Sequence, residues 1–410
     1  MNENTLKRIY VLLLLGALAA ALLLEQRRNC DFYAYYSALT WSAQSGRLPY
    51  QRWNGKPEAP PDSELGRYAL ERWDRPALRF LYPPSAIPQL LPFTWIPWFE
   101  VAAMVWSLFN VATLVAIVAL ARDFAPRQRG FGFLLLLAVA YGPLRMGMWL
   151  GQVSLWVAFL LMLFVWALRR DRGFLAGFAL GLAISLKVFP ILWAPALLLY
   201  PGQTRRCLAG GAGALALSVA LATSLYGWDA WRQYHELILS RLSLYPPRGT
   251  ISLYAYLGFG QAATAGAFES LARRGLFWLM YLPAVTAIAW RRPRTASRKF
   301  RALLLLTIVI HLAMPLTWAH YLAFFGVLLS IEISRLVPHN IRRFPATVCL
   351  LATIFFMPGL WLTSTMGLTV FWQSTQLSLL AGLLIPAALS VDSILWRKRH
   401  VSYATQSVAT

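Results

Sequence analysis

The chain contains 410 residues, of which 58% are hydrophobic and 13% are charged. Typical soluble domains are about 45–50% apolar and about 25% charged, so this composition excludes a disordered, collagen-like or ordinary soluble protein and indicates a polytopic membrane protein. The formal net charge of +22 would suggest a nucleic-acid partner in a soluble protein, but basic residues held on one side of a membrane give the same total.

The first apolar run covers residues 9–24 and follows Lys7 and Arg8. Because no small-residue cleavage site follows this run, we expect a retained transmembrane helix, with its N-terminus inside, rather than a signal peptide. A long polar segment over residues 25–80 then forms the predicted first outer loop.

Further apolar runs follow, and several are short or contain Pro or Gly, which is tolerated where a segment is buried in protein or lines a cavity. They cover residues 81–97, 98–121, 131–145, 152–168, 173–186, 188–200, 207–226, 275–290, 302–316, 321–336, 345–363 and 377–396. Another apolar stretch, at 253–268, is interpreted as interfacial.

Short basic connectors separate these runs and, together with the N-terminal residues 1–8, hold 22 of the 38 basic residues but only three of the 16 acidic residues. The connectors are residues 122–129, 169–172, 205–206, 291–301, 335–343 and 397–399. All of them lie in the cytoplasm if 81–97 is a re-entrant or partial segment, and the positive-inside rule favours that arrangement. The positive net charge is then explained mainly by basic residues on the cytoplasmic side of the membrane, and no nucleic-acid partner is needed to account for it.

The sequence therefore predicts an all-α polytopic membrane protein with about 12 transmembrane helices. We expect a single integral-membrane domain over residues 1–410. Within it, residues 81–396 form the transmembrane bundle and residues 397–410 form a cytoplasmic tail.

Lys187 interrupts an otherwise apolar stretch, and an ionisable group at membrane depth costs about 2.5–3.5 kcal/mol on insertion scales. One interpretation is a cation that holds the phosphate or diphosphate of a lipid. The other is a lysine at a helix end whose ammonium group reaches the interface. Pro190 and the short flanking runs favour a break that lines a cavity.

Asp31 lies seven residues beyond the first apolar run, at the start of an aromatic segment over residues 32–36. It fits two roles: the N-cap of a helix formed by that segment, or a general base that takes a proton from an acceptor hydroxyl. In the second role, we expect the aromatic side chains to desolvate the carboxylate partly and to bind the faces of sugars.

Three further polar residues fall on the predicted outer face. Arg145 and Arg248 are candidate cations for a phosphate, and His320 lies at the mouth of a predicted helix, where a structural hydrogen bond and a functional role are both open. The acidic residues between 58 and 74 alternate with arginines and are typical of a solvated surface. No P-loop, HExxH or GxSxG motif is present, and the three cysteines have no metal-ligand spacing, so we expect no metal site and no disulfide.

These residues belong to a series of short motifs. In chain order the motifs are DFYAYYSA at 31–38, GRLPY at 46–50, FLYPP at 80–84, GQVS at 151–154, AGFALGLA at 176–183, LKVFP at 186–190 and WAHY at 318–321. In order and spacing, the series resembles glycosyltransferase family 87, the polyprenyl-phosphate-mannose-dependent transferases of the GT-C superfamily.

The resemblance implies a GT-C-type bundle and a polyprenyl-phosphate-sugar donor used outside the cytoplasmic (inner) membrane of a bacterium, with a glycolipid or glycan acceptor and surrounding membrane lipids as the other partners. It implies a catalytic Asp at Asp31, a helper His at His320 and a carrier-phosphate site at Lys187. The candidate phosphate-binding residues are thus Lys187, Arg145 and Arg248, and the candidate substrate-binding residues are Tyr35, Tyr82, Gln152 and Trp318.

The resemblance also implies an inverting transfer without a nucleotide sugar, a cofactor or a bound metal. One departure is that family members often carry two consecutive histidines where this chain has His320 and Tyr321. From the residues alone, two other functions remain open: a non-enzymatic lipid or glycolipid transporter, and an inactive subunit of an envelope-assembly complex. Convergence of one carboxylate and the basic residues on one outer site would favour the enzyme.

Overall fold

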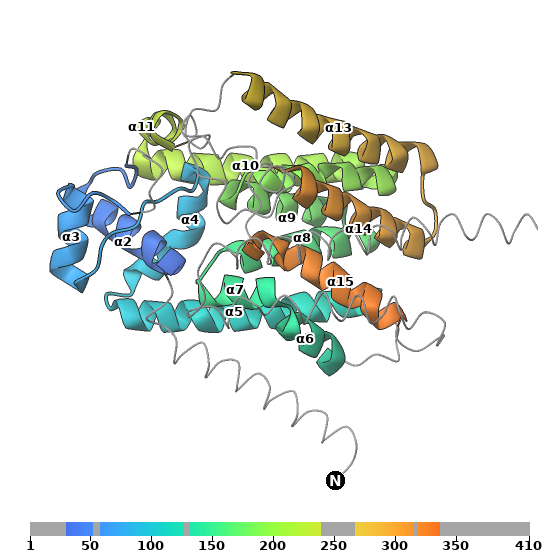
Figure 1. Cartoon of the computed structure of the whole chain (residues 1–410), viewed down its shortest axis with the longest axis horizontal. Coiled ribbons are helices and arrows are strands. Elements are labelled where there is room, and N and C mark those ends of the chain that lie inside the picture. The colour runs from blue at the N-terminus through green and yellow to red at the C-terminus, as the bar shows by residue number, and fades with distance from the viewer. Residues whose placement is uncertain (1–29, 52–57, 126–130, 239–266, 315–318, 337–410) are drawn as a thin grey trace, which may run out of the picture.

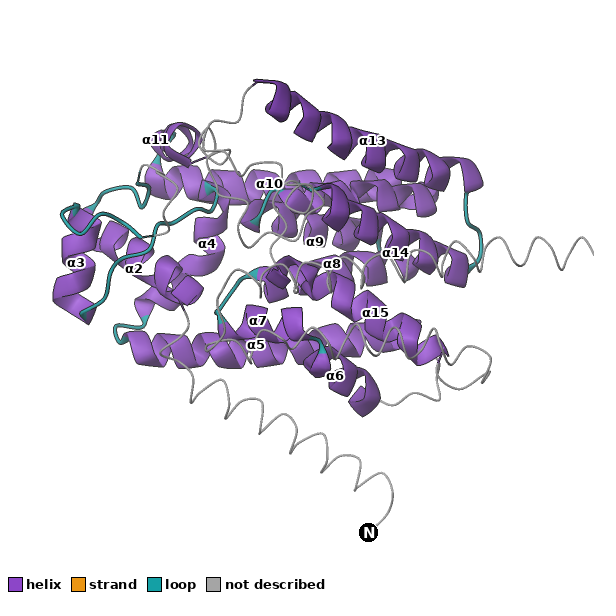
Figure 2. Ribbon diagram, in the orientation of Figure 1, coloured by secondary structure: helices purple, strands orange, loops and turns teal. Residues whose placement is uncertain are grey.

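A computed structural model describes residues 30–51, 58–125, 131–238, 267–314 and 319–336. Within these ranges the secondary structure is entirely helical, with one isolated β-bridge and no strand (Figure 2). This confirms the predicted all-α class for the described part of the chain. The predicted spans at 9–24, 345–363 and 377–396, and most of the stretch at 253–268, lie outside it.

The bundle consists of helices of 8 to 25 residues, the longer of which run side by side along the length of the molecule (Figure 1). They are α5 (Phe99–Ala121), α6 (Phe131–Ala140), α7 (Gly142–Trp149), α8 (Ser154–Arg169), α9 (Gly173–Leu186), α10 (Thr204–Tyr226), α13 (Ala267–Arg291), α14 (Ala296–Ala313) and α15 (Ala323–Leu336). Two helical stretches, Phe99–Phe124 and Pro201–Tyr226, are long and apolar enough to cross a membrane, and three shorter apolar helices accompany them. These helices match the predicted runs closely in position.

Helices α9 and α10 make the closest packing in the bundle. A Cβ atom at Gly177 would lie 1.7 Å from the backbone oxygen of Cys207, and one at Gly210 would lie 2.1 Å from that of Phe174. Only glycine allows the two backbones to approach so closely, as is common between helices that pack without polar side chains. This contact holds the N-terminal half of α9 against α10.

The segment at 81–97 is not one straight helix. It forms three short helical turns, η2 (Pro84–Ala86), α4 (Ile87–Leu90) and η3 (Leu91–Trp95), because its prolines lack the N–H that a continuous helix requires. Gln89 donates to the Ser185 hydroxyl at 2.7 Å, so these turns pack against the last turn of α9. The segment therefore packs at the end of the bundle where α9 ends.

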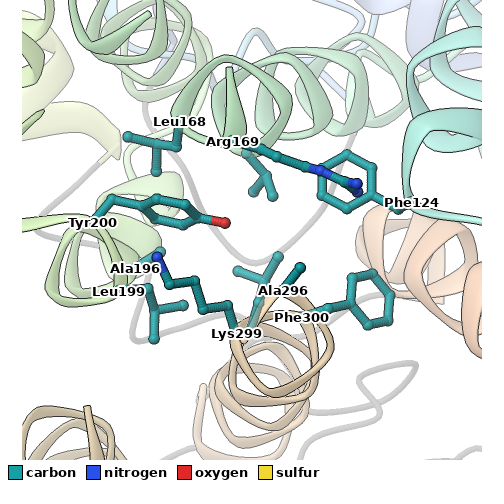
Figure 3. Close-up of a pocket in the computed structure, with 11 residues that line it drawn as sticks. Phe124, Leu168, Arg169, Ala196, Leu199, Tyr200, Ala296, Lys299 and Phe300 are labelled. Atoms are coloured by element: carbon teal, nitrogen blue, oxygen red, sulfur yellow. The ribbon is translucent and has the colours of Figure 1, made fainter. Parts of the chain in front are cut away.

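The basic connectors gather at the opposite end of the bundle. Asp123, after α5, accepts hydrogen bonds from Arg170, after α8, and Arg335 at the end of α15 donates to the Phe124 oxygen at 2.8 Å. A small pocket there is lined by Phe124, Arg169 and Lys299, which belong to three different connectors, and by Tyr200 (Figure 3). Connectors that are far apart in the sequence thus share one end, which is what a common side of a membrane requires.

The predicted first outer loop is largely helical and covers the end of the bundle away from these connectors. It contains α2 (Cys30–Ser45) and α3 (Glu64–Trp73), with α11 (Asp229–Gln233) beside them (Figure 1). The Ser63 hydroxyl accepts from the Gly66 N–H at 3.0 Å and caps α3.

The aromatic segment of α2 lies in the core rather than at an open surface. Phe32, Tyr33 and Tyr36 are at most 4% exposed, and the Phe32 ring stacks on Trp106 at 5.2 Å between centroids. The expectation that these rings bind sugar faces is therefore wrong for all three. The cause is that α2 is surrounded by α5, α3 and η3, so most of its faces are covered.

Candidate functional site

Four segments meet at the end of the bundle that α2 covers. They are the first turn of α2, the loop before η2, the turn between α7 and α8, and the break after α9. Each contributes one polar side chain to a single cluster: Asp31, Tyr82, Gln152 and Lys187.

Lys187 lies where the backbone leaves the helical conformation. Its φ of −146° and ψ of 130° are extended, and the irregular helix η5 (Phe189–Leu199) follows. Pro190 explains the position of the break, because its ring would collide with the Leu186 carbonyl if α9 continued. The Lys187 side chain is only 8% exposed, so its ammonium group requires polar partners inside the protein.

Gln152 supplies the acceptor at the centre of the cluster. Its Oε1 accepts from the Lys187 ammonium group at 3.3 Å and lies within hydrogen-bonding distance of the Tyr35 hydroxyl at 3.3 Å and the Tyr82 hydroxyl at 3.1 Å. Gly151, immediately before it, has a φ of 69°, which a residue with a Cβ rarely adopts, and this turn begins α8. The two tyrosine hydroxyls also bond each other at 2.7 Å, which fixes the orientation of the Gln152 amide.

The Lys187 ammonium group has one more hydrogen bond and two aromatic neighbours. It donates to the Ser154 hydroxyl at 3.3 Å, and it lies 4.3 Å from the centre of the Tyr321 ring and 5.3 Å from that of Tyr82. Aromatic faces attract a cation within about 6 Å. Both tyrosines are partly exposed, so the cation is held between two rings close to the edge of the protein interior.

Asp31 approaches the same glutamine from the other side. Its N–H donates to the Leu150 oxygen at 3.0 Å, and its carboxylate accepts from the Gln152 amide. Burial raises the pKa of Asp31 to about 6, while the Gln152 hydrogen bond and the charge of Lys187 oppose that rise. A carboxyl group with a pKa near 6 is ionised at neutral pH and more basic than an ordinary Asp, which suits a general base.

The cluster therefore places a carboxylate base and a fixed cation on opposite sides of one amide. A fixed cation in a low-dielectric site stabilises developing negative charge without reorganising. In the part of the chain that the structure describes, no group of three or more His, Cys, Asp or Glu side chains could hold a metal ion.

Five of the nine candidate residues come together here: Asp31, Tyr35, Tyr82, Gln152 and Lys187. Tyr35 is only 3% exposed, so its hydroxyl contacts Gln152 from the protein interior. Arg145 lies on α7, and His320 lies on η9 (Ala319–Leu322), directly before Tyr321. Arg248 and Trp318 lie outside the described residues. The roles of all nine remain predictions.

Sequence reasoning overlooked Ser154 and Tyr321 as partners of the cation. Ser154 closes the GQVS motif, and Tyr321 replaces a histidine that family members often have, so both carried a signal. The Tyr321 ring stacks on Phe189 with 4.8 Å between centroids, and this stacking holds it beside Lys187.

Comparisons with known proteins identify several relatives of this chain. Over 258 residues, the chain is 26% identical to a polyprenol-phosphate-mannose-dependent alpha-(1-2)-phosphatidylinositol pentamannoside mannosyltransferase of Mycolicibacterium smegmatis. The matched region covers 62% of this chain and 60% of that protein. It is 25% identical over 266 residues to the protein of the same description from Mycobacterium tuberculosis, with coverages of 62% and 58%. It is also 25% identical over 253 residues to GPI mannosyltransferase 1 of Eremothecium gossypii, with coverages of 56% and 60%. The matched region thus spans about 60% of the length of these curated relatives.

The family comparison is more extensive. The model for glycosyltransferase family 87 matches residues 80–317, which is more than half of the chain. The match includes Tyr82, Gln152 and Lys187, whereas Asp31 lies well before its start and His320 lies three positions after its end. Because the family model covers the greater part of the described bundle and three members of the polar cluster, the chain belongs to glycosyltransferase family 87.

Proposed function

We propose that this protein moves a sugar, a mannose-like hexose or a pentose, from a polyprenyl-phosphate donor to a lipid or glycan acceptor on the outer face of the bacterial cytoplasmic membrane. The observation that carries the proposal is the buried pair of Asp31 and Lys187 joined through Gln152. The relatives named above support mannose and a polyprenol-phosphate donor.

In the proposed reaction, the acceptor hydroxyl attacks the anomeric carbon of the donor sugar as Asp31 takes the hydroxyl proton. A carbon–oxygen bond forms at that carbon, and the bond to the phosphate oxygen breaks on the opposite face, so the configuration inverts. The leaving polyprenyl phosphate gains negative charge, which Lys187 stabilises. Arg145, Arg248 and His320 are proposed to assist at the phosphate, and Trp318 at the sugar.

A transfer assay with purified protein tests the proposal. Synthetic polyprenyl-phosphate-mannose and an extract of membrane lipids should give a mannosylated lipid with the opposite anomeric configuration, read by NMR. We expect no product from a nucleotide sugar and no effect of a metal chelator. A requirement for the nucleotide sugar, or retention of configuration, would contradict the proposed mechanism.

The proposed topology is a GT-C bundle of about 12 transmembrane helices with the polar cluster on the outside. Ser297, among the basic connectors, would then be cytoplasmic, and Asp62, before α3, would be outside. In intact cells we expect an impermeant thiol reagent to label a cysteine at position 62 and to leave one at position 297 unlabelled until the membrane is opened. The reverse pattern would contradict the topology, and labelling of a variant with the three native cysteines removed provides the background.

The pH dependence of turnover should report Asp31. Because burial raises its pKa to about 6, kcat/KM for the donor should fall as the pH drops through 6, by about tenfold per pH unit well below it. The donor phosphodiester does not titrate in this range. Replacing Lys187 by Met removes the charge that lowers the pKa of Asp31, so the midpoint should move to higher pH. An unchanged midpoint in Lys187→Met would show that the two groups are not coupled.

A further inference from the structure

A groove of about 640 Å³ opens at the surface beyond the far end of α2. It lies between that helix end, the loop that follows, the start of α3, and α11. Its walls combine two aromatic side chains with carboxylates and amides, chiefly Trp41, Tyr50, Gln51, Glu64, Asp229 and Gln233. None of these six residues has been given a role in the transfer reaction.

The charges along the groove are largely balanced. Glu64 forms an ion pair with Arg47, and Asp229 accepts from Arg232 at 2.9 Å and from Gln233 at 2.8 Å. A ligand in the groove therefore meets carboxylate oxygens and side-chain amides next to the rings of Trp41 and Tyr50. Hydroxyl-rich, uncharged molecules match this chemistry, because they donate to carboxylates, exchange hydrogen bonds with amides and present apolar ring faces to aromatic side chains.

The groove is joined to the polar cluster by a shared wall. The Tyr50 hydroxyl, at the groove, donates to the backbone oxygen of Tyr82 at 3.1 Å, and the Tyr82 hydroxyl donates to Gln152. Trp41 lies ten positions after Asp31 along α2, which corresponds to about 15 Å along the helix axis. A ligand that extends from Asp31 into the groove must therefore be longer than one sugar ring.

We infer that this groove binds the non-reacting sugars of an oligosaccharide acceptor while its terminal hydroxyl lies at Asp31. The inference rests on the proposed function and specifies its acceptor as a chain of several hexoses. The tail of the donor lipid does not fit the groove, since a polyprenyl chain is apolar and the groove is lined largely by polar side chains. The groove also lies on the Tyr50 side of Tyr82, whereas Lys187 lies against the Tyr82 ring. A charged peptide also fits poorly, because the groove's carboxylates are already paired.

The test uses a protein that carries both Asp229→Asn and Gln233→Ala, and two probes, the octyl glycosides of mannotetraose and of mannose. Glu71→Gln is the matched control, since Glu71 is exposed on α3 and does not line the groove. We expect the double variant to raise KM for the tetraose acceptor by at least about tenfold, through the loss of several hydrogen bonds. Turnover with the monosaccharide acceptor, KM for the donor and the unfolding temperature should match those of the control.

Equal effects on the two acceptors, or no effect on either, would overturn the inference. If the wild-type protein transfers sugar to neither acceptor, the proposed function is in question and the groove is tested by binding alone. Saturation-transfer NMR with free mannotetraose should then show binding to the wild-type protein and to Glu71→Gln, and none to the double variant. Absence of binding to the wild-type protein, or unchanged binding to the double variant, would reject the groove as a glycan site.

Discussion

Replacing Asp31 by Asn should lower the rate of sugar transfer by roughly 10²–10⁴-fold in a protein that still folds. Asn keeps the size of the side chain and most of its hydrogen-bonding capacity but cannot accept a proton from the acceptor. If Asp31 only supports the first turn of α2, the substitution should be nearly silent, since Asp and Asn rank together as N-caps. The two roles therefore differ by orders of magnitude in the expected rate.

The measurement is transfer from synthetic polyprenyl-phosphate-mannose, run beside a thermal-unfolding curve for each protein. Ionising Asp31 in the folded protein is unfavourable, because its pKa is raised from 3.8 to about 6. The folded state is therefore penalised as the pH rises through that window, and Asp31→Asn should be at least as stable as the wild-type protein at neutral pH. Asp62→Asn is the matched control, since Asp62 is exposed and belongs neither to the polar cluster nor to the groove lining. A stable Asp31→Asn protein with near-normal transfer would refute the catalytic role.

Replacing Lys187 by Met should lower kcat/KM for the donor by roughly 10²–10³-fold, the scale of losing one preorganised group that stabilises a leaving charge. Met has a similar length and no charge, so the interior stays filled. Part of the loss has a second origin, because Asp31 becomes an uncompensated buried carboxylate. Assays above the shifted pKa of Asp31 separate the two effects, since the base is then ionised in both proteins.

Lys187→Arg distinguishes a phosphate-binding cation from a packing residue. It keeps the charge but has a planar head, so it should retain more activity than Lys187→Met without reaching the wild-type rate. Ser154→Ala removes only one hydrogen bond to the ammonium group and should cost much less than either. If Lys187→Met turns over the donor normally, Lys187 merely extends toward the interface, as the alternative interpretation holds.

Much of the fold could be predicted from apolar runs, because a helix surrounded by apolar material must be apolar on every face. The run at 98–121 became α5. The segment at 81–97 forms short helical turns rather than one long helix, and its place as a partial membrane segment stays a prediction. Inside the first outer loop, a helix was considered only for the aromatic segment that begins α2, and α3 was not predicted. The apolar residues of α2 follow no clear helical periodicity, so its extent depends on tertiary burial.

The site was predictable where a residue was chemically out of place. A lysine in an apolar run and an aspartate before a cluster of aromatics both stood out, and they lie in the same cluster. The partners that fix them did not stand out, because Ser154 and Tyr321 are ordinary residues at helix ends whose proximity to Lys187 depends on how α8, α9 and η9 pack. The burial of Phe32, Tyr33 and Tyr36 was missed for the same reason.

The proposed function requires that the protein converts its lipid substrate chemically rather than moving it across the membrane. This is tested by following polyprenyl-phosphate-mannose in proteoliposomes that contain the purified protein and a glycolipid acceptor. Mass spectrometry would quantify the free polyprenyl phosphate and the mannosylated acceptor over time. We expect the two products to appear in equal amounts with the wild-type protein and neither to accumulate at a comparable rate with Asp31→Asn. Translocation of intact polyprenyl-phosphate-mannose, with no free polyprenyl phosphate and the same rate in Asp31→Asn, would contradict the proposed function and establish a transporter.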